Sequence, residues 1–142
     1  MFPMLRKILR TGIISEPAPK ADEDLRATTQ QLSNAMLKQI GRALVIRHID
    51  ARSCNGCELE IHALNNPYYN LEAIGIKFAA SPRHADLLLV TGPVAKNMET
   101  AVKRAYDATP EPRIVVAVGD CGCTGGIFGE SYASCGRVSN VI

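Results

Sequence analysis

Residues 113–126 read RIVVAVGDCGCTGG, a run of branched apolar residues that passes directly into a segment rich in glycine and cysteine. An uninterrupted run of this kind is typical of a strand buried in a parallel sheet. Gly119 follows the run, so Cys121 and Cys123 come soon after the strand. Ligands of open α/β sheets bind outside the carboxyl ends of the strands. The stretch therefore predicts a ligand site where this strand ends.

Strands and helices are expected to alternate along the rest of the chain. Apolar residues at helical spacing predict helices, and short apolar runs predict strands. The expected helices span residues 22–41, 57–64 and 96–108, and the expected strands span residues 43–49, 74–79, 85–91 and 113–118. The strands at 74–79 and 85–91 lack clean alternation, so we expect both of their faces to be buried. This order predicts an α/β fold, with a parallel sheet and flanking helices.

A second pair of cysteines, Cys54 and Cys57, follows the strand expected at residues 43–49. The carboxyl ends of parallel strands lie at one edge of a sheet. If this strand and the strand at residues 113–118 are neighbours, four cysteines from remote parts of the chain meet at that edge.

Size and composition limit the classes of function. The chain has 142 residues, a net charge of +2 and no Trp. A charge this small does not indicate binding to a polyanion, and few aromatic residues are present for base stacking, so nucleic acid is not expected as a partner. No run approaches the roughly 18 apolar residues of a spanning helix. The N-terminus also lacks the continuous apolar core of a secretory signal, so we expect a cytoplasmic protein.

The first 42 residues are expected to form an extension that ends in a helix and docks on a partner, ahead of an α/β domain at residues 43–142. Within the extension, residues 1–14 place Met4, Leu5, Ile8 and Leu9 on one side of a possible short helix and three basic residues on the other. Basic amphipathic segments lie on partner proteins or on membrane surfaces. A frayed terminus is the alternative.

The cysteines are the residues that carry chemistry. Five of them, unevenly spaced, favour metal binding or redox chemistry over a disulfide framework. The two-residue gap between Cys54 and Cys57 suits a zinc site, a dithiol redox pair or an iron-sulfur cluster. The further cysteines at residues 121 and 123 favour the cluster, because a redox pair needs no additional thiols. The glycines around them let backbone amides approach an anionic cluster.

Other candidate residues are expected to be structural. The histidines have no partner at a metal-binding interval, and neither a catalytic triad nor a paired-carboxylate motif is recognisable. Glu58 and Glu60 are expected to be solvated helix charges, and Cys135 a small buried residue rather than a ligand. The three histidines are His48, His62 and His84.

Three runs of sequence together resemble one family. They are residues 53–60 (SCNGCELE), 81–92 (SPRHADLLLVTG) and 119–128 (GDCGCTGGIF). They are similar to the family shared by nickel-iron hydrogenase small subunits and the 20 kDa subunit of respiratory complex I. The Cys-x-x-Cys arrangement resembles the hydrogenase branch, whereas complex I members have adjacent cysteines there. The resemblance implies a flavodoxin-like fold in a membrane-bound, energy-converting hydrogenase of the formate hydrogenlyase or carbon monoxide-induced type.

The resemblance also implies a proximal 4Fe-4S cluster and most of its ligands. Cys54, Cys57 and Cys121 match three ligand positions of the family motifs, and the family takes its fourth ligand from a later Gly-Cys-Pro segment. The C-terminal part of the fold is therefore expected to be truncated. The fourth ligand is then Cys123 or Cys135, or it is lost beyond Ile142.

Partners and location follow from the same resemblance. It implies that the subunit passes electrons from a ferredoxin-like iron-sulfur subunit to a nickel-iron large subunit, where protons become hydrogen, and that the chain has no catalytic centre of its own. Membrane subunits of the complex would hold it on the cytoplasmic face of the inner membrane. A quinone-coupled complex I-type subunit and a zinc or thiol redox module are the alternatives.

Overall fold

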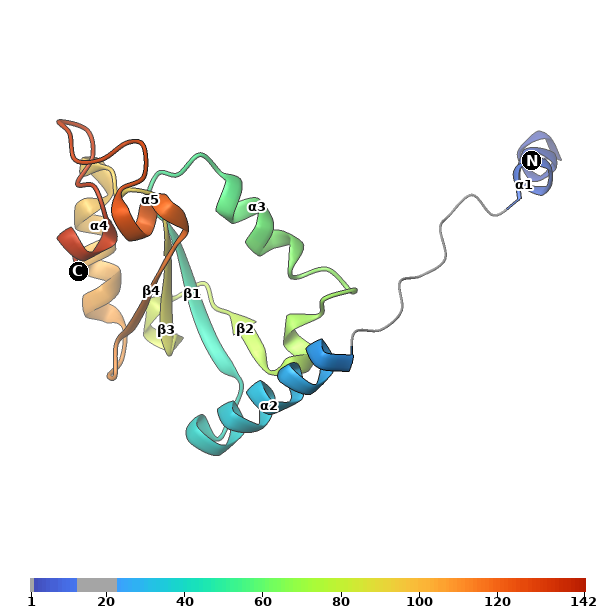
Figure 1. Cartoon of the computed structure of the whole chain (residues 1–142). Helices are drawn as coiled ribbons and strands as arrows, with labels where there is room; N and C mark the ends of the chain where they lie inside the picture. Colours follow the sequence, from blue (N-terminus) through green and yellow to red (C-terminus); the bar gives the residue numbers. More distant parts are fainter. Residues whose placement is uncertain (1, 13–22) are drawn as a thin grey trace.

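A computed structural model describes residues 2–12 and 23–142, and these form an α/β fold (Figure 1). The sheet has four parallel strands in the order β2-β1-β3-β4. This is the beginning of the flavodoxin-like order 2-1-3-4-5, so the expected fold class is confirmed. The strands are β1 (Leu44–Asp50), β2 (Ile76–Phe78), β3 (Leu87–Thr91) and β4 (Ile114–Val118).

The helices agree with the expected positions within a few residues. They are α1 (Phe2–Thr11), α2 (Glu23–Ile40), α3 (Gly56–Ala63), α4 (Lys96–Ala108) and α5 (Gly119–Thr124), with single 3-10 turns at Leu71–Ile74, Pro82–His84 and Val138–Asn140. Gly41 ends α2 in the left-handed conformation, with φ of 71°, as a glycine at a helix end does. The glycine-rich segment after β4, expected as a loop, begins as the short helix α5.

One condition for the sheet is not met, and one expectation about it is wrong. The strands β1 and β4 are not neighbours, because β3 lies between them. The strand β2 is an edge strand whose Lys77 is exposed, and β3 buries one face fully and the other only in part. Residues 74–79 contain Lys77, and a lysine in a strand is typical of the edge of a sheet. The burial of a strand face also depends on which elements cover it, which the residues of the strand do not specify.

The core lies between one face of the sheet and α4, which lie next to each other in Figure 1. Its buried residues come from β1, β3, α4, the loops that follow β1 and β3, and the segment after α5. They are Ile49, Ala51, Leu88, Val90, Val94, Val102, Cys135 and Val138. The opposite face carries α3, and at β4 it leaves Ile114 and Val116 exposed by 48% and 39%. The apolar run at β4 is therefore a strand with one face partly exposed to solvent.

Asp86 joins the start of β3 to the start of β1. Its carboxylate accepts hydrogen bonds from the Arg42 guanidinium at 2.6 and 3.1 Å and from the Val45 amide at 2.9 Å. A paired and hydrogen-bonded carboxylate of this kind fixes register as well as contributing stability. It sets these two strands side by side, and their opposite ends carry the candidate site.

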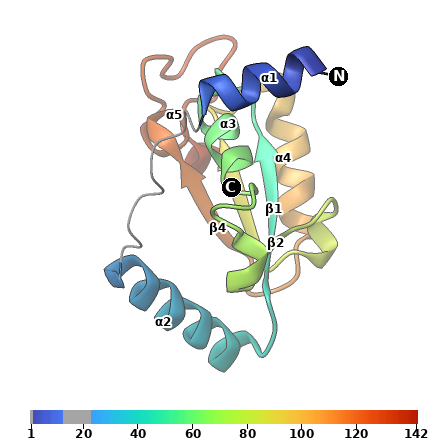
Figure 2. The same ribbon diagram turned by 90° about the vertical axis from the view of Figure 1, so that its right-hand side faces the viewer.

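Within the described residues, no helix is both long and apolar enough to cross a membrane. Helix α1 has no buried residue at all. Figure 2 shows the same chain after a quarter turn, with α3 in front of the sheet and α2 at the lower left.

Candidate functional site

The first cysteine segment is shaped by the end of β1. The Asp50 carboxylate accepts hydrogen bonds from the amides of Arg52 and Ser53 at 2.8 and 3.0 Å, and the Ser53 hydroxyl accepts one from the Asn55 amide at 3.0 Å. Arg52 and Asn55 both have left-handed backbones, with φ of 73° and 69°. Asx and Ser turns of this kind hold tight loops. They place the first cysteine of the motif just before α3 and the second in its first turn.

This segment crosses the end of β3 at Gly92. A Cβ atom at Gly92 would lie 3.0 Å from the carbonyl carbon of Arg52 and the amide nitrogen of Ser53, and its φ is 88°. Only glycine suits a left-handed position with backbone this close. The loop after β1 can therefore reach across β3 toward α5. The two cysteine segments meet although their strands are not neighbours.

The sulfur atoms of the two segments are lined by glycine. A Cβ atom at Gly119, where φ is 73°, would lie 2.8 Å from the Cys57 sulfur, and one at Gly126 would lie 3.1 Å from the Cys121 sulfur. Both distances are shorter than an ordinary contact of 3.4 to 4 Å. The missing side chains leave room around these two thiols and expose backbone there.

Two of the cysteines act electrostatically on a third. Burial raises the pKa of the Cys57 thiol, and the negative charges of Glu58, Cys54 and Cys121 raise this pKa further. Cys121 therefore lies close enough to the first motif for its charge to be felt there. Three thiolates at one place repel one another, so a metal centre that supplies positive charge would stabilise their deprotonated form.

These residues fit a cluster better than a single ion. No set of three or more His, Cys, Asp or Glu residues in the described ranges is arranged to hold one metal ion. In an iron-sulfur cluster each thiolate binds a different iron atom, so the sulfur atoms need not converge on one point. Thiolates are the donors that such clusters use, and close backbone amides are their usual surroundings.

The other two cysteines are held elsewhere. The Cys123 thiol is exposed and donates a hydrogen bond to the Ala117 carbonyl at 3.5 Å. Cys135 is only 5% exposed within the core, where its thiol donates to the Glu99 carboxylate at 3.6 Å. Burial raises the pKa of this thiol, as for a packing residue.

Glu58 does not have the expected environment. It was predicted to be a solvated helix charge, but it is only 4% exposed and faces His48 of β1, with 4.0 Å between His48 Nε2 and its Oε1. Neither carboxylate oxygen makes a hydrogen bond of ordinary geometry. Burial acts to raise the pKa of Glu58, but the nearby hydroxyls of Ser53 and Thr91, the amide of Glu58 itself and His48 together lower it.

His48 and Thr91 complete this polar group beneath the first cysteine segment. His48 Nε2 lies 3.0 Å from the Thr91 hydroxyl, and burial lowers the pKa of His48 despite the carboxylates of Glu58 and Asp50. The expectation of a structural role for this histidine fits these contacts. The sequence did contain a signal for the group, because the twofold period of β1 and β3 puts His48 and Thr91 on one face. It gave no sign that α3 would close over that face with a carboxylate.

Comparison with known proteins gives a matching family and several relatives. Residues 54–142 match the family described as NADH ubiquinone oxidoreductase, 20 Kd subunit. A probable membrane-bound hydrogenase subunit from Pyrococcus furiosus is 48% identical over 96 residues, which are 68% of this chain and 58% of that protein. Formate hydrogenlyase subunit 7 from Escherichia coli is 41% identical over 108 residues, 76% of this chain and 42% of that protein. The chain thus spans about half the length of these curated relatives.

A solved structure shares the fold. The match is to a chain in the structure of a membrane-bound sulfane sulfur reductase, an archaeal respiratory membrane complex. It has a TM-score of 0.58 and 30% sequence identity, and it covers 78% of this chain and 58% of the other.

Proposed function

Since the chain belongs to the family of the NADH ubiquinone oxidoreductase 20 Kd subunit, we propose that it is the electron-transfer small subunit of a multi-subunit nickel-iron hydrogenase. In this role Cys54, Cys57 and Cys121 hold a proximal 4Fe-4S cluster. The observation that carries the proposal is the grouping of these three thiols, with Gly119 leaving space at the Cys57 sulfur. The relatives named as hydrogenase and formate hydrogenlyase subunits support the hydrogenase branch.

The residues of the chain supply binding and surroundings, not a reaction. The turn held by Asp50 orients the first two thiols, and the crossing at Gly92 brings them toward the third. When bound, the cluster accepts and donates one electron at a time. The buried Glu58 adds fixed negative charge beside Cys57, and negative charge near a cluster lowers its reduction potential. The chain on this proposal has no catalytic centre of its own.

The other two cysteines, Cys123 and Cys135, are the candidates for the fourth ligand within the chain. The Cys123 thiol donates a hydrogen bond to the Ala117 carbonyl of β4, and Cys135 is packed in the core on the side of α4. Each thiol already has its own hydrogen-bond acceptor, so we propose that neither is a ligand.

The proposed partners follow from the relatives. We propose that a nickel-iron large subunit receives the electrons, that a ferredoxin-like iron-sulfur subunit donates them, and that membrane subunits place the complex on the cytoplasmic face of the inner membrane. The Pyrococcus furiosus relative is named as a membrane-bound hydrogenase subunit, and the structural relative belongs to a respiratory membrane complex.

A quinone-coupled, complex I-type subunit is the second candidate, and the description of the family itself favours it. Against it stands the Cys-x-x-Cys arrangement of Cys54 and Cys57, which resembles the hydrogenase branch.

The test is anaerobic purification of the complex through a tag on this chain, with the partner subunits co-expressed. We expect iron and acid-labile sulfide, a 4Fe-4S signal in electron spin resonance, and hydrogen evolution from a reduced one-electron donor. Cys57→Ser should lose the iron of one cluster and hydrogen evolution, whereas the matched variant Cys123→Ser should keep both. Quinone reduction without hydrogen evolution would select the second candidate. Zinc without iron, or a reversible disulfide between Cys54 and Cys57, would contradict both.

A further inference from the structure

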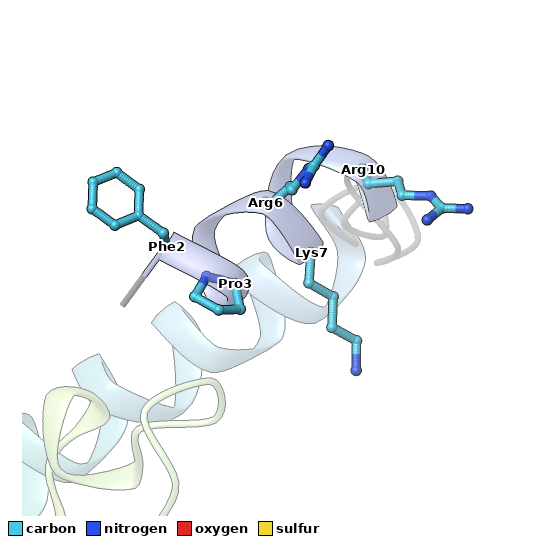
Figure 3. Close-up of a pocket in the computed structure, with 5 residues that line it drawn as sticks. All are labelled: Phe2, Pro3, Arg6, Lys7 and Arg10. Atoms are coloured by element: carbon cyan, nitrogen blue, oxygen red, sulfur yellow. The ribbon is translucent and has the colours of Figure 1, made fainter.

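Helix α1 is an exposed amphipathic helix that the proposed function does not use. All of its residues from Phe2 to Thr11 are exposed, and none is buried against the rest of the described chain. Figure 3 shows a hollow lined by Phe2, Pro3, Arg6, Lys7 and Arg10, all of which lie on α1. The hollow is therefore part of the surface of one helix. It is not a cavity between elements, and its importance lies in the side chains it presents.

The side chains of α1 are divided into two arcs. At 100° per residue, the apolar residues fall within one arc of about 160°, and the basic residues fall within the opposite arc. The apolar arc comprises Phe2, Met4, Leu5, Ile8 and Leu9, and the basic arc Arg6, Lys7 and Arg10. The two extremes of the apolar arc are open to solvent, with Phe2 exposed by 86% and Met4 by 67%.

The charge of α1 has a single sign. Residues 2–12 contain three cations and no carboxylate or amide side chain, so polar recognition by this segment depends on cations alone. Helix α2 differs, since Glu23 and Asp24 balance Arg26 and Lys38. A partner with a negatively charged surface above an apolar interior complements α1 on both arcs, because the charge attracts the basic arc and the interior accepts the apolar arc. An anionic lipid bilayer has this structure.

We propose that α1 lies in the interface of an anionic lipid bilayer and attaches this subunit directly to the membrane. The apolar arc enters the boundary of the acyl chains, and Arg6, Lys7 and Arg10 contact lipid phosphates. With ten residues, α1 is about 15 Å long, so it lies along the surface and does not span it. The inference is independent of the cluster, because none of the cysteines takes part.

The first test measures binding of the full-length chain to vesicles by co-sedimentation. Vesicles of phosphatidylglycerol mixed with phosphatidylcholine are compared with vesicles of phosphatidylcholine alone, at low and high salt. A triple variant, Arg6→Gln with Lys7→Gln and Arg10→Gln, removes the basic arc. The matched control replaces three exposed cations outside α1, Lys38, Lys77 and Arg104, by glutamine. Both variants lose the same charge, and neither touches the core.

The expected results are large differences. Each cation near an anionic surface contributes about fivefold in partitioning, so removal of three should weaken binding to anionic vesicles by about 100-fold. The control variant should bind within a few-fold of the natural sequence, and high salt should weaken its binding. Equal binding by the two variants would overturn the inference. So would binding that ignores lipid charge, or failure to bind vesicles at all, which is the outcome expected if α1 docks on a protein.

A second test reports insertion itself. The chain contains no tryptophan, so Phe2→Trp gives a unique fluorophore in the apolar arc. Its emission should shift to shorter wavelength on addition of phosphatidylglycerol-containing vesicles, because the indole leaves water. Leu37→Trp, at an exposed apolar position of α2, should not shift. An unshifted Phe2→Trp protein that nevertheless sediments with vesicles would contradict the proposed orientation of α1.

Discussion

The close approach of Gly119 to the Cys57 sulfur gives the most specific prediction about the site. Gly119→Ala puts a methyl group 2.8 Å from the Cys57 sulfur, against 3.4 Å for the closest ordinary contact, so the sulfur must move by at least about 0.6 Å. Gly119 also has φ of 73°, and the left-handed conformation costs alanine about 1–2 kcal/mol. The substitution therefore combines a backbone cost with displacement of a proposed ligand.

Gly41→Ala separates these two effects. Its φ of 71° is almost the same, but a Cβ atom there meets nothing within 4 Å. We expect Gly41→Ala to lower the free energy of unfolding by the backbone cost alone, about 1–2 kcal/mol. Gly119→Ala should lose about 1–3 kcal/mol more, because overpacking adds to the same backbone cost.

The assays are urea unfolding of the isolated chain and iron analysis of the anaerobically purified complex. Iron content should fall in Gly119→Ala and stay unchanged in Gly41→Ala, since only the first variant moves a sulfur atom. If the two variants lost the same free energy of unfolding and kept the same iron content, the contact between Gly119 and Cys57 would have no role in the site.

Further variants test the site, the core and the pH dependence of stability. Cys57→Ser should lower the iron content of the complex by the share of one cluster, while Cys135→Ser should keep the full content and lower only the free energy of unfolding; an unchanged iron content in Cys57→Ser would refute the ligand assignment. Leu88→Ala, at a fully buried position of β3, should lower the free energy of unfolding in urea by about 2–5 kcal/mol. Leu59→Ala is the control, since Leu59 is 61% exposed, and it should lower the same free energy by less than about 0.5 kcal/mol. Similar losses in the two variants would contradict the assigned core. Burial lowers the pKa of His48 below its ordinary 6.5, so the unfolded chain binds this proton more readily, and stability should fall as the pH decreases through about 6.5. His48→Gln should reduce the dependence of the free energy of unfolding on pH, measured by chemical denaturation at several pH values. An unchanged dependence would show that other groups cause it.

The secondary structure was predictable from local sequence. Helix α4 has the expected bounds, Lys96–Ala108, because its apolar period is regular and two prolines follow it. The strands were found because β-branched runs have few other local structures available. The glycine-rich segment after β4 was harder, since glycine disfavours helices. It nevertheless forms the short α5, whose end at Gly125 has φ of 92°.

The surroundings of the cysteines were less predictable. The burial of Glu58 depends on α3 lying over the face of the sheet that carries His48, and no local pattern specifies that contact. The crossing of the first cysteine segment over β3 also depends on a distant residue, Gly92, whose missing side chain accommodates the backbone of Arg52.

The sequence by itself determined the α/β class, the alternation of helices and strands, and the two cysteine segments as the candidate site. These features rest on short-range periodicity and on residue chemistry, which a linear sequence contains. Only the tertiary structure decided the strand order, which places β3 between β1 and β4, and which cysteines meet. Strand order depends on how long connections pack across the sheet, and that packing joins residues that are far apart along the chain. For the same reason Cys121 reaches the first motif while Cys135 is held in the core.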